Sequence, residues 1–253
     1  MPTKISWTDE TWNPVSGCTK VSPGCLNCYA SRMAQRLRGR FGYPQDDPFA
    51  VTLHPERLEE PLRWKKPRRI FVCSMGDLFH PRVPWVFISD VFQVMAFTPE
   101  HTYQVLTKRP GRMAHWATTH VWPPNVWAGV SIESAKYLPR AKFLYDMKCS
   151  NRNIKTFVSG EPLLDPLDGL ASYLNWKDFD LVPTAARRHF MPCVDLAIVG
   201  GETGPGARPM NLDWARSIRD QCQVADVPFH LKALGPTRAA GHLLDGVEHR
   251  EVP

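Results

Sequence analysis

Apolar, β-rich runs alternate with amphipathic stretches along most of the 253-residue chain. The runs predict strands at residues 70–74, 102–107, 126–131, 155–159, 196–200 and 229–232, with an earlier strand near 11–15. The stretches between them predict helices at residues 29–38, 85–97, 110–117, 135–147, 212–225 and, in a short form, near 167–174. Six or seven strand-helix units result, which is the pattern of a parallel α/β fold.

The predicted strands are apolar enough to be covered on both faces, which favours a barrel or doubly wound sheet over an antiparallel sandwich. We expect one domain over residues 1–253, an α/β fold built as a TIM-like β/α barrel that is partial, with six or seven parallel units. Residues 40–66 and 175–193 break the alternation, and the second stretch carries Arg187, Arg188 and His189. Structureless connections of this length are uncommon unless they are functional or disordered, so both are predicted to be inserted loops.

The composition leaves several classes of partner open. The formal net charge is +6, which permits nucleic acid or a phosphorylated substrate, although many enzymes without such partners carry this charge. No window approaches the roughly 18 uninterrupted apolar residues of a membrane span, and residues 1–9 contain no apolar signal region. We therefore expect a cytoplasmic protein with no membrane partner.

Three of the seven cysteines lie close together, in a Cys-x6-Cys-x2-Cys spacing just before a predicted helix. Cys18, Cys25 and Cys28 can converge on one centre, because Gly17 and the Pro23-Gly24 pair allow the backbone to turn around it. A structural zinc site needs a fourth protein ligand, whereas three cysteines on a four-iron, four-sulfur (4Fe-4S) cluster leave one iron open. The spacing favours the cluster.

The alternative is a zinc loop that a distant side chain completes. The candidates for that fourth ligand are His54, His80 and Cys73. Metal analysis separates the two kinds of centre.

Seven short phrases, in this order, resemble a family of phage-associated and bacterial proteins with a three-cysteine motif, related at a distance to radical S-adenosylmethionine (SAM) enzymes. The phrases are Trp7-Thr-Asp-Glu-Thr-Trp12-Asn13-Pro14, the cysteine loop, Ser74-Met-Gly-Asp77-Leu-Phe79-His80, Leu106-Thr-Lys108-Arg109-Pro110, Gly129-Val-Ser131-Ile-Glu133, Ser159-Gly-Glu161-Pro162-Leu-Leu164 and Gly200-Gly201-Glu202-Thr-Gly204.

This resemblance implies that the open iron binds SAM and that one electron cleaves SAM to a 5′-deoxyadenosyl radical. The usual spacing in radical SAM enzymes is three residues and then two, with an aromatic residue before the third cysteine. Here the first gap is six and Asn27 occupies the aromatic position. Tyr29 is our candidate for the missing adenine contact.

Polar residues end successive predicted strands, and in a barrel these ends open on one face, where barrel enzymes place their sites. By the resemblance, Asp77 with Ser74 would hold the methionine amine, Ser131 and Glu133 the ribose, and Lys108 or Arg109 the methionine carboxylate or a substrate phosphate. The candidates for catalysis are Lys108, Glu161, Glu202 and Lys232. Solvated loop charges or salt bridges between strand ends are the plainer interpretation of each residue.

We expect a radical SAM enzyme that acts on nucleic acid or a nucleotide and receives its electron from a donor such as flavodoxin or ferredoxin. If it is phage-encoded, it would act in the host cytoplasm. The alternative is a nucleic-acid-binding or processing protein with a structural zinc or iron–sulfur centre. For that class the basic run at residues 63–69 (RWKKPRR) is a candidate surface, although it also suits a solvated loop.

Overall fold

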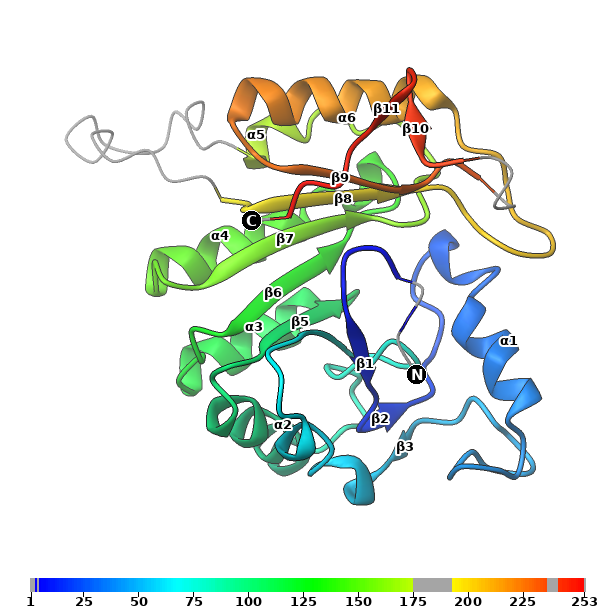
Figure 1. Ribbon diagram of the computed structural model, residues 1–253, viewed down its shortest axis with the longest axis vertical. Coiled ribbons are helices and arrows are strands. Elements are labelled where there is room, and N and C mark those ends of the chain that lie inside the picture. Colours follow the sequence, from blue (N-terminus) through cyan, green and yellow to red (C-terminus); the bar gives the residue numbers. More distant parts are fainter. Residues whose placement is uncertain (1–2, 4, 175–192, 236–240, 253) are drawn as a thin grey trace. The chain divides into compact units, whose positions relative to one another are not determined.

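The computed structural model describes residues 3, 5–174, 193–235 and 241–252 (Figure 1). Seven strands form a parallel sheet in the order β1-β4-β5-β6-β7-β8-β9. Their bounds are β1 Glu10–Trp12, β4 Arg69–Val72, β5 Thr102–Thr107, β6 Val126–Ser131, β7 Lys155–Gly160, β8 Leu196–Gly200 and β9 Phe229–Ala233. The prediction of an α/β fold, a partial TIM-like barrel with parallel strands, is confirmed.

Helices connect the strands of this sheet. They are α1 Tyr29–Arg36, α2 Trp85–Phe97, α3 Pro110–Thr119, α4 Arg140–Ser150, α5 Ala171–Leu174 and α6 Leu212–Ala225. Short 3₁₀ helices lie at η1 Pro23–Cys25, η2 Pro55–Arg57, η3 Pro61–Arg63 and η4 Ala135–Tyr137. No helix among the described residues has the length and apolar character that crossing a membrane requires.

The chain divides into two compact units, Met1–Gly129 and Val130–Pro253. In the first unit, aromatic side chains pack the core beside β4 and β5. The Phe92 ring lies 5.1 Å from that of Trp116 and 5.0 Å from that of Trp122. Trp7 and Trp12 are almost completely buried. These four tryptophans therefore belong to the core and not to a stacking surface.

Residues 40–66 form more than a loop. Strand β3 (Thr52–Leu53) pairs antiparallel with β2 (Val15–Ser16), directly before the cysteine loop. The buried His54 ring lies 2.7 Å, Nε2 to Oγ, from Ser16, and the Trp12 indole donates to the carbonyl of Arg57 at 2.8 Å. This segment supports the strand that leads into the cysteines.

In the predicted basic surface at residues 63–69, Arg63 ends η3 and Arg69 is the first residue of β4. Arg68 pairs with Glu10 at 3.0 Å and Arg69 pairs with Asp9 at 3.2 Å. These two cations therefore join the entry of β4 to that of β1. The predicted inserted loop at 175–193, with Arg187, Arg188 and His189, lies outside the described residues except for Cys193.

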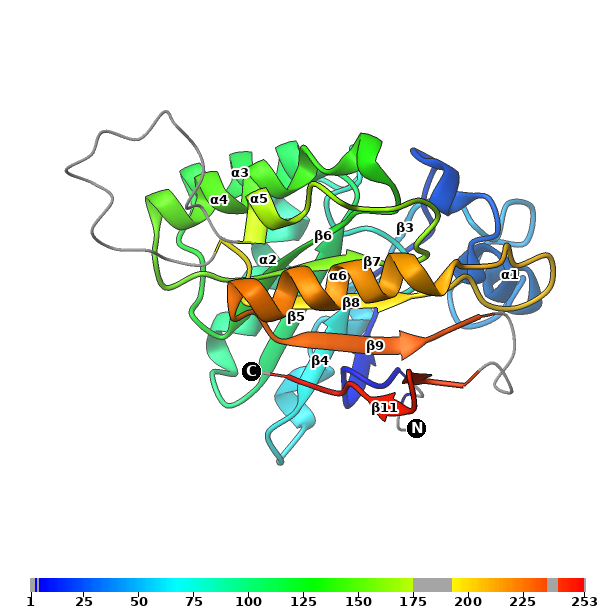
Figure 2. The same ribbon diagram turned by 90° about the horizontal axis from the view of Figure 1, so that it is seen from above.

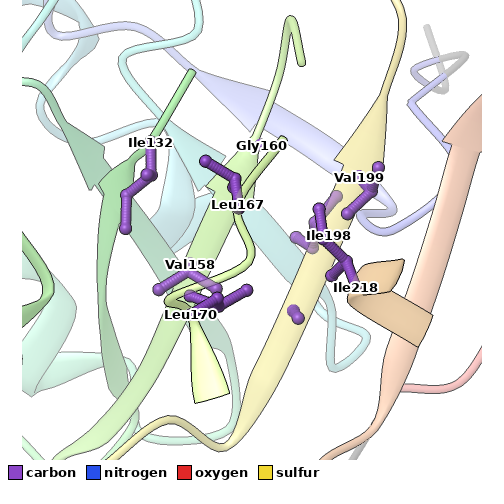
Figure 3. Close-up of a pocket in the computed structure, with 9 residues that line it drawn as sticks. Ile132, Val158, Gly160, Leu167, Leu170, Ile198, Val199 and Ile218 are labelled. Atoms are coloured by element: carbon purple, nitrogen blue, oxygen red, sulfur yellow. The ribbon is translucent and has the colours of Figure 1, made fainter. Parts of the chain in front are cut away.

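In the second unit, α6 runs along β8 and β9 (Figures 1 and 2). Its N-terminus is capped by Asn211, whose side chain accepts a hydrogen bond from the Asp213 amide. A small apolar pocket between the sheet and the covering helices has no room for a water molecule. Its lining is aliphatic, and Figure 3 shows Ile132, Val158, Leu167, Leu170, Ile198 and Ile218 around it. The pocket is therefore part of the core.

Candidate metal centre

The cysteine loop begins where β2 ends and is fixed by backbone contacts. The Gly17 amide donates to the Met75 carbonyl at 2.9 Å, and the Cys18 amide donates to the Phe49 carbonyl at 3.2 Å. Gly17 has a φ of 80°, and a Cβ at this position would lie 2.0 Å from the Ala50 carbonyl oxygen. Only glycine allows this close approach of two backbone segments.

The three cysteines of the loop carry free, half-buried thiols. Cys25 ends η1, and its sulfur lies 3.6 Å from the Ser22 hydroxyl. Cys28 immediately precedes the first residue of α1. The charge of Cys25 also raises the pKa of Cys18, so these two thiols interact electrostatically.

Asp77 organises the polar groups beside the loop. Its carboxylate accepts from the Thr107 hydroxyl at 2.8 Å, from the Arg109 guanidinium at 2.8 Å and from the Lys108 amide at 3.3 Å. It also accepts from the Phe79 amide at 3.0 Å. Asp77 and Arg109 are thus brought together by the ends of β4 and β5, as parallel strands require.

Arg109 reaches from the end of β5 to the cysteine loop. Its Nη1 lies 3.4 Å from the Cys18 sulfur, and its Nη2 donates to both the carbonyl and the hydroxyl of Thr19, at 3.1 and 3.0 Å. Pro110, the next residue, is the first residue of α3, so Arg109 occupies the N-cap position of that helix.

The two interacting thiols differ in acidity. Burial and the negative charge of Asp77 raise the pKa of Cys18, although Arg109 opposes them. Burial also works against ionisation of Cys25, but the hydrogen bond of the Val21 backbone and the charge of Lys108 outweigh it and lower the pKa of that thiol. Consecutive cations at the end of β5 therefore act on two different cysteines.

The donor set fits an iron–sulfur cluster by its chemistry, because it offers three part-exposed thiols and a cation beside two of them. Among the described residues, no group of three or more His, Cys, Asp or Glu side chains is arranged to hold a single metal ion. The predicted fourth ligands of the zinc alternative are engaged or enclosed: His54 contacts Ser16, His80 contacts Thr19, and Cys73 is buried.

Tyr29 and Ser74 also meet in the first unit. The Tyr29 hydroxyl donates to the Ser74 carbonyl. The Ser74 hydroxyl donates to the side-chain oxygen of Asn13 at 3.1 Å, and the Met75 amide donates to the same oxygen at 2.9 Å. Helix α1 is therefore tied to the turn between β4 and Asp77.

In the second unit, Glu161 and Lys232 form an ion pair of 2.8 Å at the ends of β7 and β9. The Ser159 hydroxyl lies 3.3 Å from the same carboxylate. Gly200 lets this pair approach the end of β8, because a Cβ there would lie 3.0 Å from a Glu161 carboxylate oxygen. Two predicted catalytic residues are thus in direct contact.

The other candidates of the second unit pair separately. Glu202 binds Arg208 at 2.6 Å and also accepts from its amide at 2.9 Å. Glu133 is completely buried and pairs with Arg140 at 2.8 Å. Arg140 also donates to the Ser131 carbonyl at 2.7 Å. The expectation that all these strand ends ring one cavity stays a prediction.

A family model described as "Protein of unknown function (DUF5131)" matches residues 2–253. The chain belongs to the DUF5131 family. No curated protein matches the sequence.

The fold of this DUF5131 member is similar to that of spore photoproduct lyase. A cysteine-to-serine mutant of that lyase matches with a TM-score of 0.50 and 12% identity, over 87% of this chain and 62% of the other. The chain thus spans about three fifths of the lyase. A second lyase structure, complexed with dinucleoside spore photoproduct, matches with a TM-score of 0.46 and 11% identity, over 82% and 58% of the two chains.

Three residues of this DUF5131 chain belong to the site although sequence reasoning gave them no role there. Asn13 holds the turn after β4, Thr107 holds Asp77, and Thr19 joins Arg109 to His80. Thr107 and Asn13 lie within the quoted phrases, as does His80, which was considered only as a zinc ligand. Their position beside charged strand ends was the available signal.

Proposed function

We propose that the protein is a radical SAM enzyme whose 4Fe-4S cluster is held by Cys18, Cys25 and Cys28. The observation that carries this proposal is the loop itself: three part-exposed thiols on a tightly fixed turn, beside the cations and the carboxylate that follow β4 and β5. The fold shared with spore photoproduct lyase and the sequence resemblance support it. When bound, the cluster would supply one electron for cleavage of SAM to a 5′-deoxyadenosyl radical.

The residues around the loop suit a zwitterionic ligand. We assign the methionine amine to Asp77, whose carboxylate is already oriented by four donors. The methionine carboxylate falls to Lys108 or Arg109. Tyr29 and Ser74, which are joined by a hydrogen bond, would face the rest of the cofactor.

In the second unit, the pair of Glu161 and Lys232 is the proposed site of proton transfer. A carboxylate and an ammonium in contact, only partly exposed, can hold a proton and pass it to a substrate. Glu202 would act beside a substrate anion that Arg208 attracts. Ser131 and Glu133 stay candidates for binding the ribose. Glu133 would then replace part of its interaction with Arg140 by hydrogen bonds to the ribose.

For the substrate we propose nucleic acid or a nucleotide, and for the electron source a donor such as flavodoxin or ferredoxin. Residues 17–45, which include the cysteine loop and α1, contain five Lys and Arg and no Asp or Glu. A surface with this charge attracts phosphates and acidic proteins alike. A cytoplasmic setting, or that of the host if the gene is carried by a phage, belongs to the same proposal.

The deciding experiment is reductive cleavage of SAM. Protein reconstituted without oxygen is reduced with dithionite, and 5′-deoxyadenosine and methionine are quantified by chromatography. We expect cleavage by the wild type and by Cys149→Ala, which removes an exposed cysteine outside the loop, and none by Cys25→Ala. Stoichiometric zinc with no cleavage would favour the alternative, a nucleic-acid-binding or processing protein with a structural centre.

A further inference from the structure

We infer that Arg109 is a positioning residue that orders the cysteine loop and raises the reduction potential of the cluster through its hydrogen bond to Cys18. This inference rests on the proposed function, because a potential exists only if a cluster is bound. It gives Arg109 a task other than binding the methionine carboxylate, which then falls to Lys108.

The guanidinium of Arg109 is engaged on both terminal nitrogens. Nη1 lies 2.8 Å from an Asp77 carboxylate oxygen and 3.4 Å from the Cys18 sulfur. Nη2 donates to the Thr19 carbonyl and hydroxyl at 3.1 and 3.0 Å. A planar fork with fixed donors can hold such a set, whereas the single ammonium of lysine cannot reach all four acceptors.

The surroundings hold this guanidinium in one place. The Arg109 side chain is 11% exposed and that of Asp77 is 7% exposed. Thr107 accepts from the Arg109 amide at 2.9 Å and donates to Asp77 at 2.8 Å. His80 lies 2.9 Å from the Thr19 hydroxyl, and its Nδ1 accepts from the Arg82 amide, so its Nε2 carries the proton that Thr19 receives.

The contact at Cys18 has an electrochemical consequence. Reduction adds negative charge to a cluster, and a cationic N–H donor on a ligand sulfur stabilises the reduced form. Asp77 acts in the opposite direction, since its carboxylate also bears on Cys18. Loss of the Arg109 charge would therefore remove the stabilising donor and leave the Asp77 carboxylate without its partner, and both changes lower the potential.

The test compares wild-type protein, Arg109→Gln and Arg109→Lys, with Arg63→Gln as the matched control. Arg63 lies in the same unit, its side chain is 72% exposed, and it pairs at 3.5 Å with the equally exposed Glu59, four residues earlier. After anaerobic reconstitution, iron and sulfide content and the midpoint potential are measured for each protein. Circular dichroism reports the fold, and hydrogen–deuterium exchange of residues 17–28 in the cluster-free protein reports the order of the loop.

We expect Arg109→Gln to lower the midpoint potential by at least about 59 mV. For one electron this equals a tenfold change in the ratio of reduced to oxidised cluster. Arg109→Lys should fall between it and the wild type, and Arg63→Gln should equal the wild type. Poor cluster loading by a normally folded Arg109→Gln would support the positioning role. If Arg109→Gln does not fold, Arg109→Lys decides, because it keeps the charge and loses the fork.

The inference is overturned if Arg109→Gln has the midpoint potential, the cluster content and the hydrogen–deuterium exchange of the loop that the wild type has. If Arg109→Gln is unfolded, the same result in Arg109→Lys overturns it. A wild type that takes up no cluster would overturn the proposed function instead. In that case the hydrogen–deuterium exchange data still test whether Arg109 orders the loop. Faster exchange of the loop in the variant supports this role, and unchanged exchange refutes it.

Discussion

The two units of the chain treat the charges at their strand ends differently. In Met1–Gly129, Asp77 and Arg109 join each other and then extend to Cys18 and Thr19 on a neighbouring loop. In Val130–Pro253, the carboxylates at the strand ends have their own cations: Glu133 with Arg140, Glu161 with Lys232, and Glu202 with Arg208. The first arrangement reaches a thiol of the cysteine loop, whereas the second consists of pairs between one carboxylate and one cation.

This difference teaches that a charged residue at a strand end is not by itself a site. Similar ion pairs occur in both units, with distances between 2.6 and 2.8 Å. What distinguishes the pair of Asp77 and Arg109 is a third group, the Cys18 thiol, whose sulfur lies 3.4 Å from Arg109. Variants that remove one element of each arrangement should therefore affect different properties of the protein.

The broadest effect, on stability and on iron content together, is expected at one of two glycines with the same φ of 80°. Gly17→Ala and Gly241→Ala both incur the cost of a left-handed conformation, about 1–2 kcal/mol. At Gly17 the new methyl group also meets the Ala50 backbone, whereas none of the residues that the structure describes lies within 4 Å of it at Gly241. We expect Gly17→Ala to lower the free energy of unfolding by about 3 kcal/mol or more and to reduce iron content, measured by urea denaturation and metal analysis. Equal losses in the two variants would contradict the fixed turn.

Next in size is the buried pair of the second unit. Arg140→Met leaves the completely buried carboxylate of Glu133 without its cation, and breaking such a pair costs about 3–5 kcal/mol. Lys142→Met, which breaks an exposed pair on the same helix, should cost less than about 0.5 kcal/mol. Both variants should load iron normally. Loss of iron from Arg140→Met with unchanged stability would show that this pair serves the cofactor and not the fold.

The smallest expected effect is on the pH dependence of stability, through His54 in the segment that supports the cysteine loop. Burial lowers the pKa of His54 below its ordinary value of 6.5, and the charge of Arg57 adds to the effect. As the pH falls below about 6.5, the unfolded chain binds the proton first, so stability declines with a slope of at most about 1.4 kcal/mol per pH unit from this group.

His54→Gln should reduce that slope in urea denaturation between pH 5 and pH 7. A residual slope remains, because burial and the charge of Arg109 lower the pKa of His80 as well. An unchanged slope in His54→Gln would mean that burial does not hold the ring neutral in the folded protein.

Six strands of the sheet could be predicted from the sequence to within two residues, because apolar runs buried on both faces leave little ambiguity. The first predicted strand, near residues 11–15, is divided between β1 and β2. Helix α4 was predicted to begin at Ala135 but begins at Arg140, after η4. Pro139 explains the difference, since proline cannot donate the backbone hydrogen bond that a continuous helix needs. The β2–β3 pair was not predicted, because strands of two residues carry no periodicity.

In the site, residue identities were predictable and partners were not. Asp77, Arg109 and the cysteines were candidates from their phrases, but Arg109 and Cys18 are 91 positions apart. Contacts over such a distance follow from the packing of whole strands and loops and not from local spacing. The same reason hid the pairing of Glu161 with Lys232.

The most direct test of the central claim is the metal and acid-labile sulfide content of protein purified without oxygen. The triple variant Cys18→Ala, Cys25→Ala, Cys28→Ala serves for comparison, with Cys149→Ala as the control. We predict about four irons and four sulfides per chain in the wild type and in the control, and none in the triple variant, whose circular dichroism stays native. About one zinc per chain, or no metal at all, would contradict the account.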